Sequence, residues 1–435
     1  ARAQRHALAT GTPPRAVTVC EDEPFPPAVC LVAIEPVSNF ILLEQYAPDR
    51  TAATWTQALT TALAGLPVTV VQGTSDEAQA LRHHVAHDLG ARHSSDLFHG
   101  QQAVSKATRL HLARDVRQTT AAVAAAQAQV DAARAAELAY YAQSPRPRGR
   151  PPAFGARIDA AVTALIRAED VQTQAVARQT QAGEQIRELG ILYHPYDLAN
   201  GQAQPVARVA ARFADLWASL ADLADAADLP ARAREHLAKA QRLTVPWLAT
   251  LAFFWGTVQT RVAALDLAPD LEQAVLTQLI PALYLARVAG RSPHAADRHR
   301  LMALSASLLE PLRQPTHPLQ ALAPARRAQI EATATGCADL FQRSSSCVEG
   351  RNGHLSLYHH GSHRLSDRKL AALTALHNYY VRRPDGTTAA ERFFGRAHPA
   401  LLEQVLAHVD LPPPPRRKGP RPVKRPALAL ALVAA

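Results

Sequence analysis

Short apolar runs rich in β-branched residues alternate with helical patterns between residue 15 and about residue 100. The runs AVTVCEDEPF, AVCLVAIEPVSNF and ILLEQY predict three strands, of which the last two are separated by a turn at Ser38 and Asn39. Thr51 can cap a helix through TWTQALTTALAGL, and PVTVVQGTSD predicts a fourth strand. EAQALRHHVAHDLG predicts a helix closed by Gly90, and RHSSDLFHG predicts a short fifth strand. This order predicts an α/β fold with a mixed sheet covered by helices, preceded by a loop over ARAQRHALATGTPP.

Residues 105–190 predict a long helical hairpin. Val116, Val123 and Val130 recur every seven residues in an Ala- and Gln-rich segment, and a second helical pattern follows it. SPRPRGRPPAFG separates the two patterns, and no helix can continue through its prolines. We therefore expect two helices joined by a basic tip. The valines are expected to pack inside the hairpin, and a dimer zipper is the alternative.

The remaining sequence predicts more helices and a basic tail. Residues 205–335 include a compact apolar part with three tryptophans, and they show neither strand alternation nor a fixed repeat. Residues 101–335 therefore predict one all-helical insertion, and residues 336–411 continue with helical patterns. Residues 412–435 are rich in proline and basic residues and lack any acidic residue, so they predict a disordered polycationic tail.

The composition favours a polyanionic partner. The 47 basic and 37 acidic residues give a formal charge of +10, and the pI is about 9.8. The four cysteines show no close pairing pattern, which is typical of a reducing compartment. The most apolar helical segment, VPWLATLAFFWGTV, is shorter than the ~20 residues that a membrane span needs. We expect a cytoplasmic protein with no membrane segment.

Three acidic residues stand where a metal site would need them. Asp22 and Asp76 end short β-branched runs, where a strand delivers a side chain to the edge of a sheet, and Glu349 opens a predicted helix. Three converging carboxylates can hold two divalent cations about 3.5–4 Å apart for phosphodiester chemistry. Hard cations such as Mg²⁺ prefer oxygen ligands. The sequence therefore predicts a site for two Mg²⁺ or Mn²⁺ ions at Asp22, Asp76 and Glu349.

Each of these acids has an alternative interpretation. Asp22 lies between Glu21 and Glu23, and because strand side chains alternate it faces away from both; Glu23 is its main rival. Asp76 could simply cap the helix that follows it. Glu349 could be a structural residue in the first turn of its helix, which would leave Glu391 as the alternative third acid.

Further polar residues, Glu23 among them, are candidates for accessory roles near the metal site. Asp96 and His99 in SSDLFH are expected to end the fifth strand close to the metal site. Arginines and hydroxyl groups near turns and helix starts suit contact with DNA phosphates. The candidate DNA-binding residues are Arg351, Asn352, His354, Arg382, Arg383, Thr387, Thr388, Arg392, Arg416, Arg417 and Lys418.

Several segments together resemble a bacterial insertion-sequence transposase of the DDE type. They are CEDEPF, LVAIEPVSNFILLEQYAPDRTAATW, TSDEAQAL, HSSDLFH, CVEGRNGHLSLYHHGSHRLSDRKLAALTALHNYYVRRPDGTTAAERFFG and LPPPPRRK. They cover the two ends of the chain, roughly residues 15–110 and 335–420. The resemblance implies a ribonuclease H-like catalytic core that begins in residues 1–100, is interrupted by the all-helical insertion, and resumes with the helix carrying Glu349.

The resemblance also implies an activity. Asp22 matches the first strand aspartate of the family, Asp76 the aspartate after the fourth strand, and Glu349 the glutamate of the late helix. The implied reaction is metal-dependent cleavage of double-stranded DNA at transposon ends, followed by transfer of the strand into target DNA. A dimer or higher oligomer on DNA is expected, because transposition joins two DNA ends. The alternatives are an inactive transposase-derived DNA-binding protein and a metal-dependent nuclease without strand transfer.

Overall fold

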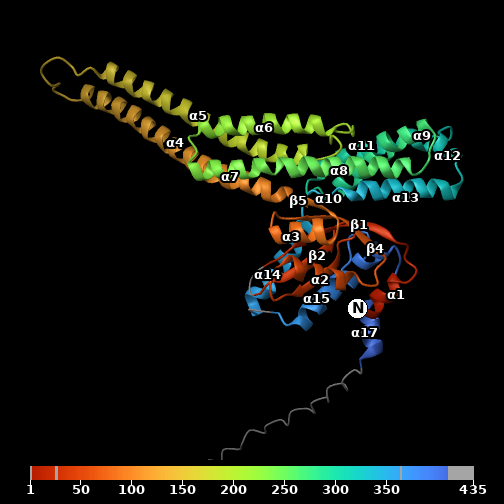
Figure 1. Ribbon diagram of the computed structural model, residues 1–435. Helices are drawn as coiled ribbons and strands as arrows, with labels where there is room; N and C mark the ends of the chain where they lie inside the picture. The colour runs from red at the N-terminus through yellow and green to blue at the C-terminus, as the bar shows by residue number, and fades with distance from the viewer. Residues whose placement is uncertain (1, 25–27, 363–364, 410–435) are drawn as a thin grey trace, which may run out of the picture.

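The computed structural model describes residues 2–24, 28–362 and 365–409. The chain is a mixed α/β protein. A five-stranded sheet with its own covering helices lies beside a large layer of helices from the middle of the sequence (Figure 1). The candidate residues in the tail, Arg416, Arg417 and Lys418, lie outside the described residues.

The five predicted strands are confirmed and form one mixed sheet in the order β3-β2-β1-β4-β5. Strand β2 pairs antiparallel with both β1 and β3, whereas β4 pairs parallel with β1 and with β5. The predicted turn between β2 and β3 contains Asn39, whose φ of 63° is the left-handed conformation that asparagine tolerates. The strands are β1 (Arg15–Asp22), β2 (Cys30–Glu35), β3 (Phe40–Tyr46), β4 (Val68–Ser75) and β5 (Arg92–Ser95).

Helices cover both faces of this sheet. On one face, Trp55, Leu59 and Leu81 pack against apolar side chains of β2 and β3. On the other face, Val348 and Leu370 pack against Cys20 and its neighbours in the sheet. The helices of the first face are α2 (Ala52–Leu63), α3 (Gln79–His83) and the π-helical turn η1 (His84–Asp88), and those of the second are α14 (Ser346–Ser362) and α15 (Asp367–Tyr379). Thr51 caps α2 as predicted, because its side chain accepts a hydrogen bond from the backbone N–H of Thr54.

The prediction of a loop at the start of the chain was wrong, because residues Arg2–Ala9 form helix α1. The contacts that stabilise it come from the far end of the chain. Gln4 donates to the ring of His398, and the guanidinium of Arg396 donates to carbonyl groups at the end of α1. A segment of eight residues carries too little periodicity to reveal such a helix by itself. The C-terminal helices that adjoin it are α16 (Ala389–Phe394) and α17 (Leu401–His408).

The predicted hairpin is formed by α4 (Leu97–Tyr141) and α5 (Phe154–Leu192). The two helices run side by side and extend beyond the other helices of the insertion (Figure 1). Val130 is 1% exposed and packs inside the hairpin, whereas Val116 and Val123 are half-buried. The residues of the tip, 141–153, are all exposed.

The other helices of the insertion share one apolar core with the base of the hairpin. The core extends from Leu97 to Phe341 in sequence, and fully buried Trp247 contacts the rings of Tyr193 and Phe213 within it. In the described residues, no helix is both long and apolar enough to span a membrane. The helices are α6 (Val206–Ala226), α7 (Ala231–Arg242), α8 (Thr244–Ala263), α9 (Pro269–Ala274), η2 (Val275–Leu279), α10 (Ile280–Arg291), α11 (Ala295–Arg313), α12 (Pro318–Ala321) and α13 (Pro324–Leu340).

Candidate functional site

The register of the parallel strands places three aspartates in one row at one edge of the sheet. Cys20 of β1 pairs with Thr74 of β4, so continuing the ladder by two residues brings Asp22 beside Asp76. Ser75 pairs with Ser95 of β5, so the next position brings Asp76 beside Asp96. The carboxyl ends of neighbouring parallel strands are where α/β proteins build their sites.

Strand alternation separates Asp22 from the glutamates on either side of it. Glu23 accepts a hydrogen bond from Trp55 Nε1 at 2.8 Å, and Glu21 lies 3.6 Å from the ring of His84. Both partners belong to the α2 face of the sheet, whereas Asp22 contacts α14 on the opposite face. Glu23 is therefore held by the protein itself, and Asp22 is the acid that reaches the α14 face.

Glu349 lies in the first turn of α14, as predicted, and approaches the aspartate row from above the sheet. Burial raises the pKa of Glu349, and the negative charge of Asp22 raises it further. Burial also raises the pKa of Asp22; the backbone N–H of Glu23 opposes this shift, and the charge of Asp76 adds to it. The acids are thus close enough to repel one another, as the ligands of a divalent cation would in its absence.

Asn352 also belongs to this site. Its Nδ2 donates a hydrogen bond to Asp22 Oδ2 at 2.7 Å, while its buried Oδ1 has no hydrogen-bond partner. We expected Asn352 to bind DNA and did not connect it with Asp22. The available signal was its spacing from Glu349, because residues three apart share one face of a helix.

Asp76 combines a local hydrogen bond with a free oxygen. Its Oδ1 accepts a hydrogen bond from the backbone N–H of Ala78 at 2.9 Å, as an aspartate does in a turn that leads into a helix. Its Oδ2 has no hydrogen-bond partner among the described residues. The N-cap of α3 is Ala78, so the alternative that Asp76 caps this helix was wrong; Asp76 holds the turn before α3 with one oxygen and keeps the other available to a cation.

Both carboxylate oxygens of Asp96 accept hydrogen bonds from other parts of the protein. Its Oδ1 accepts from the backbone N–H of Phe98 at 2.7 Å and caps α4, and its Oδ2 accepts from the hydroxyl of Ser345 at 2.5 Å. The expectation that Asp96 and His99 end the fifth strand was wrong, because β5 ends at Ser95 and His99 lies inside α4. Asp96 caps α4 with its side chain, and this cap favours a helix that starts at Leu97 over a longer strand.

The described residues contain no three His, Cys, Asp or Glu side chains gathered closely enough to form a ready-made metal site. The donor set nevertheless fits a hard divalent cation. Asp22, Asp76 and Glu349 supply carboxylates, and Asn352 Oδ1 is a buried carbonyl oxygen without a partner. Burial raises the pKa of Asp22 and Glu349, and the neighbouring carboxylates add to this shift.

Most of the candidate DNA-binding residues have partners within the protein. The guanidinium of Arg351 donates two hydrogen bonds of 2.7 Å to Glu44, and this ion pair is buried. Thr388 is 0% exposed and forms a capping box with Glu391, which places Glu391 at the start of α16 rather than beside Asp22. Arg382, Thr387 and Arg392 bond to groups around the turn at Gly386. Arg383 and Arg392 donate to the carbonyl oxygens of Val37 and Ser38 in the turn between β2 and β3, and His354 is exposed on α14.

Comparison with known proteins adds one finding. Residues 275–421 match the model of a family described as "Family of unknown function (DUF6399)". The matched segment begins within the helical insertion and continues through Glu349 and Asn352 into the C-terminal helices. No curated protein matches the chain. No solved structure matches it either.

Proposed function

We propose that this chain is a metal-dependent DNA strand transferase, a DDE-type transposase with a ribonuclease H-like core. The observation that carries the proposal is the row formed by Asp22 and Asp76 at the carboxyl ends of adjacent parallel strands, with Glu349 above the same face. Side chains from three segments separated by up to 327 positions (349 − 22) approach one another at this edge.

The topology supports the proposal. A sheet ordered β3-β2-β1-β4-β5, in which only β2 is antiparallel to its neighbours, is the arrangement expected of a ribonuclease H-like core. The helical insertion enters after β5 and returns directly to the helix that carries Glu349. It therefore separates the acids in sequence while leaving them together in space.

The proposed roles follow from the contacts. Asp22, Asp76 and Glu349 would hold Mg²⁺ or Mn²⁺, and Asn352 would orient Asp22 and offer its unpartnered carbonyl oxygen. The bound cations would supply an activated oxygen nucleophile and stabilise the leaving oxygen of a phosphodiester. Asp96 positions the start of α14, and thereby Glu349, through its hydrogen bonds to Ser345.

The charge of the chain supports DNA as the substrate. The formal charge is +10, and the exposed tip of the hairpin carries Arg146, Arg148 and Arg150. Such a surface attracts the phosphate backbone without reading its sequence. Two DNA ends must be joined in transposition, so we propose that the active form on DNA is a dimer or a higher oligomer.

A second candidate is a non-catalytic DNA-binding protein with the same ancestry. The observation that favours it is that the described residues contain no closed group of three metal-binding side chains. The two candidates differ in a measurable way. A catalytic site should gather its acids around the cation when metal and DNA are present, whereas the non-catalytic protein should bind DNA without cutting it.

The test is a cleavage and joining assay on duplex DNA that carries the sequences flanking the coding region of the protein. Asp22→Asn and Glu349→Gln are compared with wild type in Mg²⁺, in Mn²⁺ and in EDTA, and DNA binding is measured in parallel. Asp159→Asn, a change at an exposed acid on α5, is the matched control. We expect the two site variants to bind DNA without cutting, and the control to cut and join like wild type.

Three results would count against this proposal. If the folded wild type binds DNA but never cuts it with either cation, the non-catalytic candidate replaces the transposase. If DNA is cut but no joined product forms, the protein is a nuclease. Equal activity of wild type and Asp22→Asn would place the chemistry elsewhere in the molecule.

A further inference from the structure

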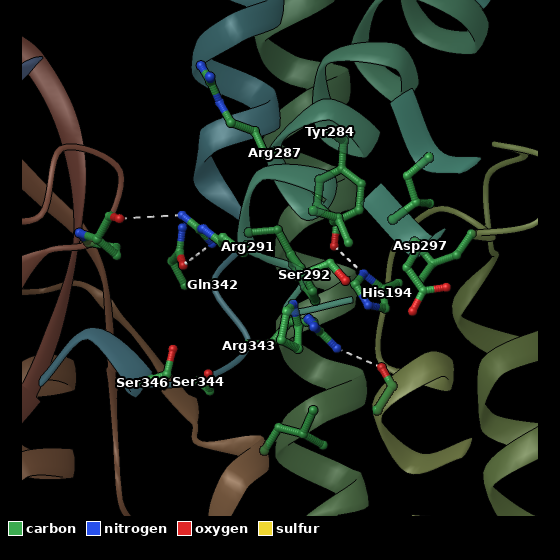
Figure 2. Close-up of a pocket in the computed structure, with 18 of the residues that line it drawn as sticks. His194, Tyr284, Arg287, Arg291, Ser292, Asp297, Gln342, Arg343, Ser344 and Ser346 are labelled. Carbon is green, nitrogen blue, oxygen red and sulfur yellow. Dashed lines mark hydrogen bonds between the residues drawn. The ribbon is translucent and has the colours of Figure 1, made fainter. Parts of the chain in front are cut away.

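A cavity of about 930 Å³ lies where the helical insertion meets the sheet. Its walls come from the end of α5, from α10 and α11, and from the segment that links α13 to α14. Pro36 and Asn39 of the turn between β2 and β3 form the side nearest the sheet. Figure 2 shows Arg291 and Arg343 entering this space from different segments, with Tyr284 and His194 to one side of them.

The cavity is strongly basic. Two acidic residues, Asp297 and Asp339, line it together with six arginines, so its formal charge is +4 (6 − 2) with the histidines neutral. The arginines come from five different parts of the fold, and no local sequence pattern brings them together. They are Arg187, Arg287, Arg291, Arg300, Arg343 and Arg383.

Both acids are already paired, which leaves most of the positive charge without a partner. Arg287 Nε donates to Asp339 Oδ1 at 2.5 Å, and Arg300 lies 3.7 Å from Asp297. Among the described residues, no carboxylate lies within ion-pair distance of the other four arginines. The cavity therefore has a deficit of negative charge.

Arg291 and Arg343 make hydrogen bonds to neutral groups only. Arg291 Nη1 donates to Gln342 Oε1 at 2.9 Å, and Arg343 Nη1 donates to the carbonyl oxygen of Gly190 at 2.6 Å (Figure 2). Burial lowers the pKa of the Arg343 guanidinium, although it stays protonated near neutral pH. A buried cation without a counterion is unfavourable, and an anionic ligand would offset that cost.

The cavity adjoins the acidic site. Leu97 and Phe98 line it, and they directly follow Asp96 in the chain. Ser346 also lines it, and it begins α14 three residues before Glu349. Phe98 is 42% exposed, so its ring offers an apolar face at the wall. Arginines beside an exposed aromatic ring are typical of sites for single-stranded nucleic acid.

We propose that this cavity binds the phosphodiester backbone of a single nucleic-acid strand that leads away from the acidic site. Its volume lies in the range of small-ligand sites, about 300–1,000 Å³, so a strand segment can enter it. A duplex, whose major groove alone is about 12 Å wide, cannot. The identity of the ligand as nucleic acid rests on the proposed function. The excess positive charge of the cavity is independent of that function.

The test measures binding of a fluorescent single-stranded DNA of about 12 nucleotides by anisotropy, in EDTA and at several salt concentrations. The variant is Arg187→Gln/Arg291→Gln, since both side chains are exposed and neither forms an ion pair. The matched control is Arg208→Gln/Arg232→Gln, which removes the same charge from exposed positions on α6 and α7 outside the cavity.

We expect the cavity variant to bind at least about tenfold more weakly, and the slope of log K against log salt to fall by about 1.4, which corresponds to two lost phosphate contacts at about 0.7 each. The control should change affinity less than about twofold. Duplex DNA of equal length should compete poorly. Equal weakening by both double variants, or an unchanged salt slope, would overturn the proposal.

Competition identifies the source of the phosphate. If a deoxynucleoside triphosphate or inorganic phosphate displaces the strand at equal phosphate concentration, the cavity is a site for free phosphates and the strand proposal is wrong. Binding is also measured with Asp22→Asn. Asp22→Asn should bind the strand like wild type, because EDTA removes any metal chemistry. Strand binding by a wild type that never cuts DNA in Mg²⁺ or Mn²⁺ would contradict the proposed function alone.

Discussion

The carboxylate of Asp96 accepts hydrogen bonds from both the backbone N–H and the hydroxyl of Ser345, 249 positions further along the chain. This contact joins the end of β5 to the residue that precedes α14. Since Glu349 lies in the first turn of α14, Asp96 fixes where the third acid of the site stands relative to the sheet. Asp96, which was expected close to the metal site, thus acts by positioning Glu349.

We predict that Asp96→Ala destabilises the protein by about 2–4 kcal/mol, because it removes the cap of α4 and leaves Ser345 without its acceptor. Ser345→Ala removes only one of these hydrogen bonds and should cost about 1 kcal/mol. Urea denaturation of both variants measures the difference. Equal stability of Asp96→Ala and wild type would contradict the structural role.

The buried pair of Arg351 and Glu44 should contribute to stability rather than to DNA affinity. Arg351→Ala leaves the carboxylate of Glu44 buried with only Thr374 as a partner, and we expect a loss of about 3–5 kcal/mol. Replacing both charges, in Arg351→Met/Glu44→Leu, should recover most of that loss. Thermal denaturation tests this. If the double variant is less stable than Arg351→Ala, the ion pair is not the cause.

Gly100 is required by the packing of the insertion. A Cβ at this position would lie 2.5 Å from Cη2 of Trp247, which is fully buried. Gly100→Ala should therefore destabilise by about 1–3 kcal/mol. The matched control is Gly183→Ala, where a Cβ meets nothing within 4 Å and the better helix propensity should stabilise by up to about 1 kcal/mol. Denaturation curves measure the change in the free energy of unfolding, and a loss for Gly100→Ala with a gain for Gly183→Ala would confirm this contact.

The acidic site should make stability depend on pH. Burial and neighbouring carboxylates raise the pKa of Asp22 and Glu349 above their ordinary values of 3.8 and 4.5. The folded state therefore keeps protons that the unfolded state has released, and the free energy of unfolding falls as pH rises from about 4 through the raised pKa values. Asp22→Asn should weaken this fall and stabilise the protein at pH 7 by about 1 kcal/mol. An unchanged pH profile of stability would contradict this.

Much of the sheet and of the candidate site could be predicted from the sequence because their signals are local. Each strand is a short β-branched run bounded by turn residues, and an acid at the end of such a run reaches the sheet edge. Asp22 and Asp76 were found in this way, and Glu349 was found because it opens a predicted helix. Helix α1 was missed because its stability depends on Arg396 and His398, near the other end of the chain.

The rest depended on contacts that no local pattern encodes. Asn352 meets Asp22, and Arg351 meets Glu44, only because α14 packs against strands more than 300 positions earlier in the chain. The basic cavity draws its arginines from positions 187 to 383. Charge in the sequence predicted a polyanionic partner but not where on the molecule the positive charge collects.

The most direct test of the central claim is the metal dependence of Asp76→Cys in the cleavage assay. Asp76 is chosen because a residue that only holds the turn before α3 and a residue that also binds metal predict different metal dependence for Asp76→Cys. Mg²⁺ is a hard cation that prefers oxygen ligands, whereas Mn²⁺ accepts sulfur more readily. We predict that Asp76→Cys loses at least about 100-fold activity in Mg²⁺ and recovers much of it in Mn²⁺, while Asp76→Ala is inactive with both. Equal activity of Asp76→Cys and wild type in Mg²⁺, or no recovery in Mn²⁺ by a folded, DNA-binding variant, would contradict the assignment of Asp76 as a metal ligand.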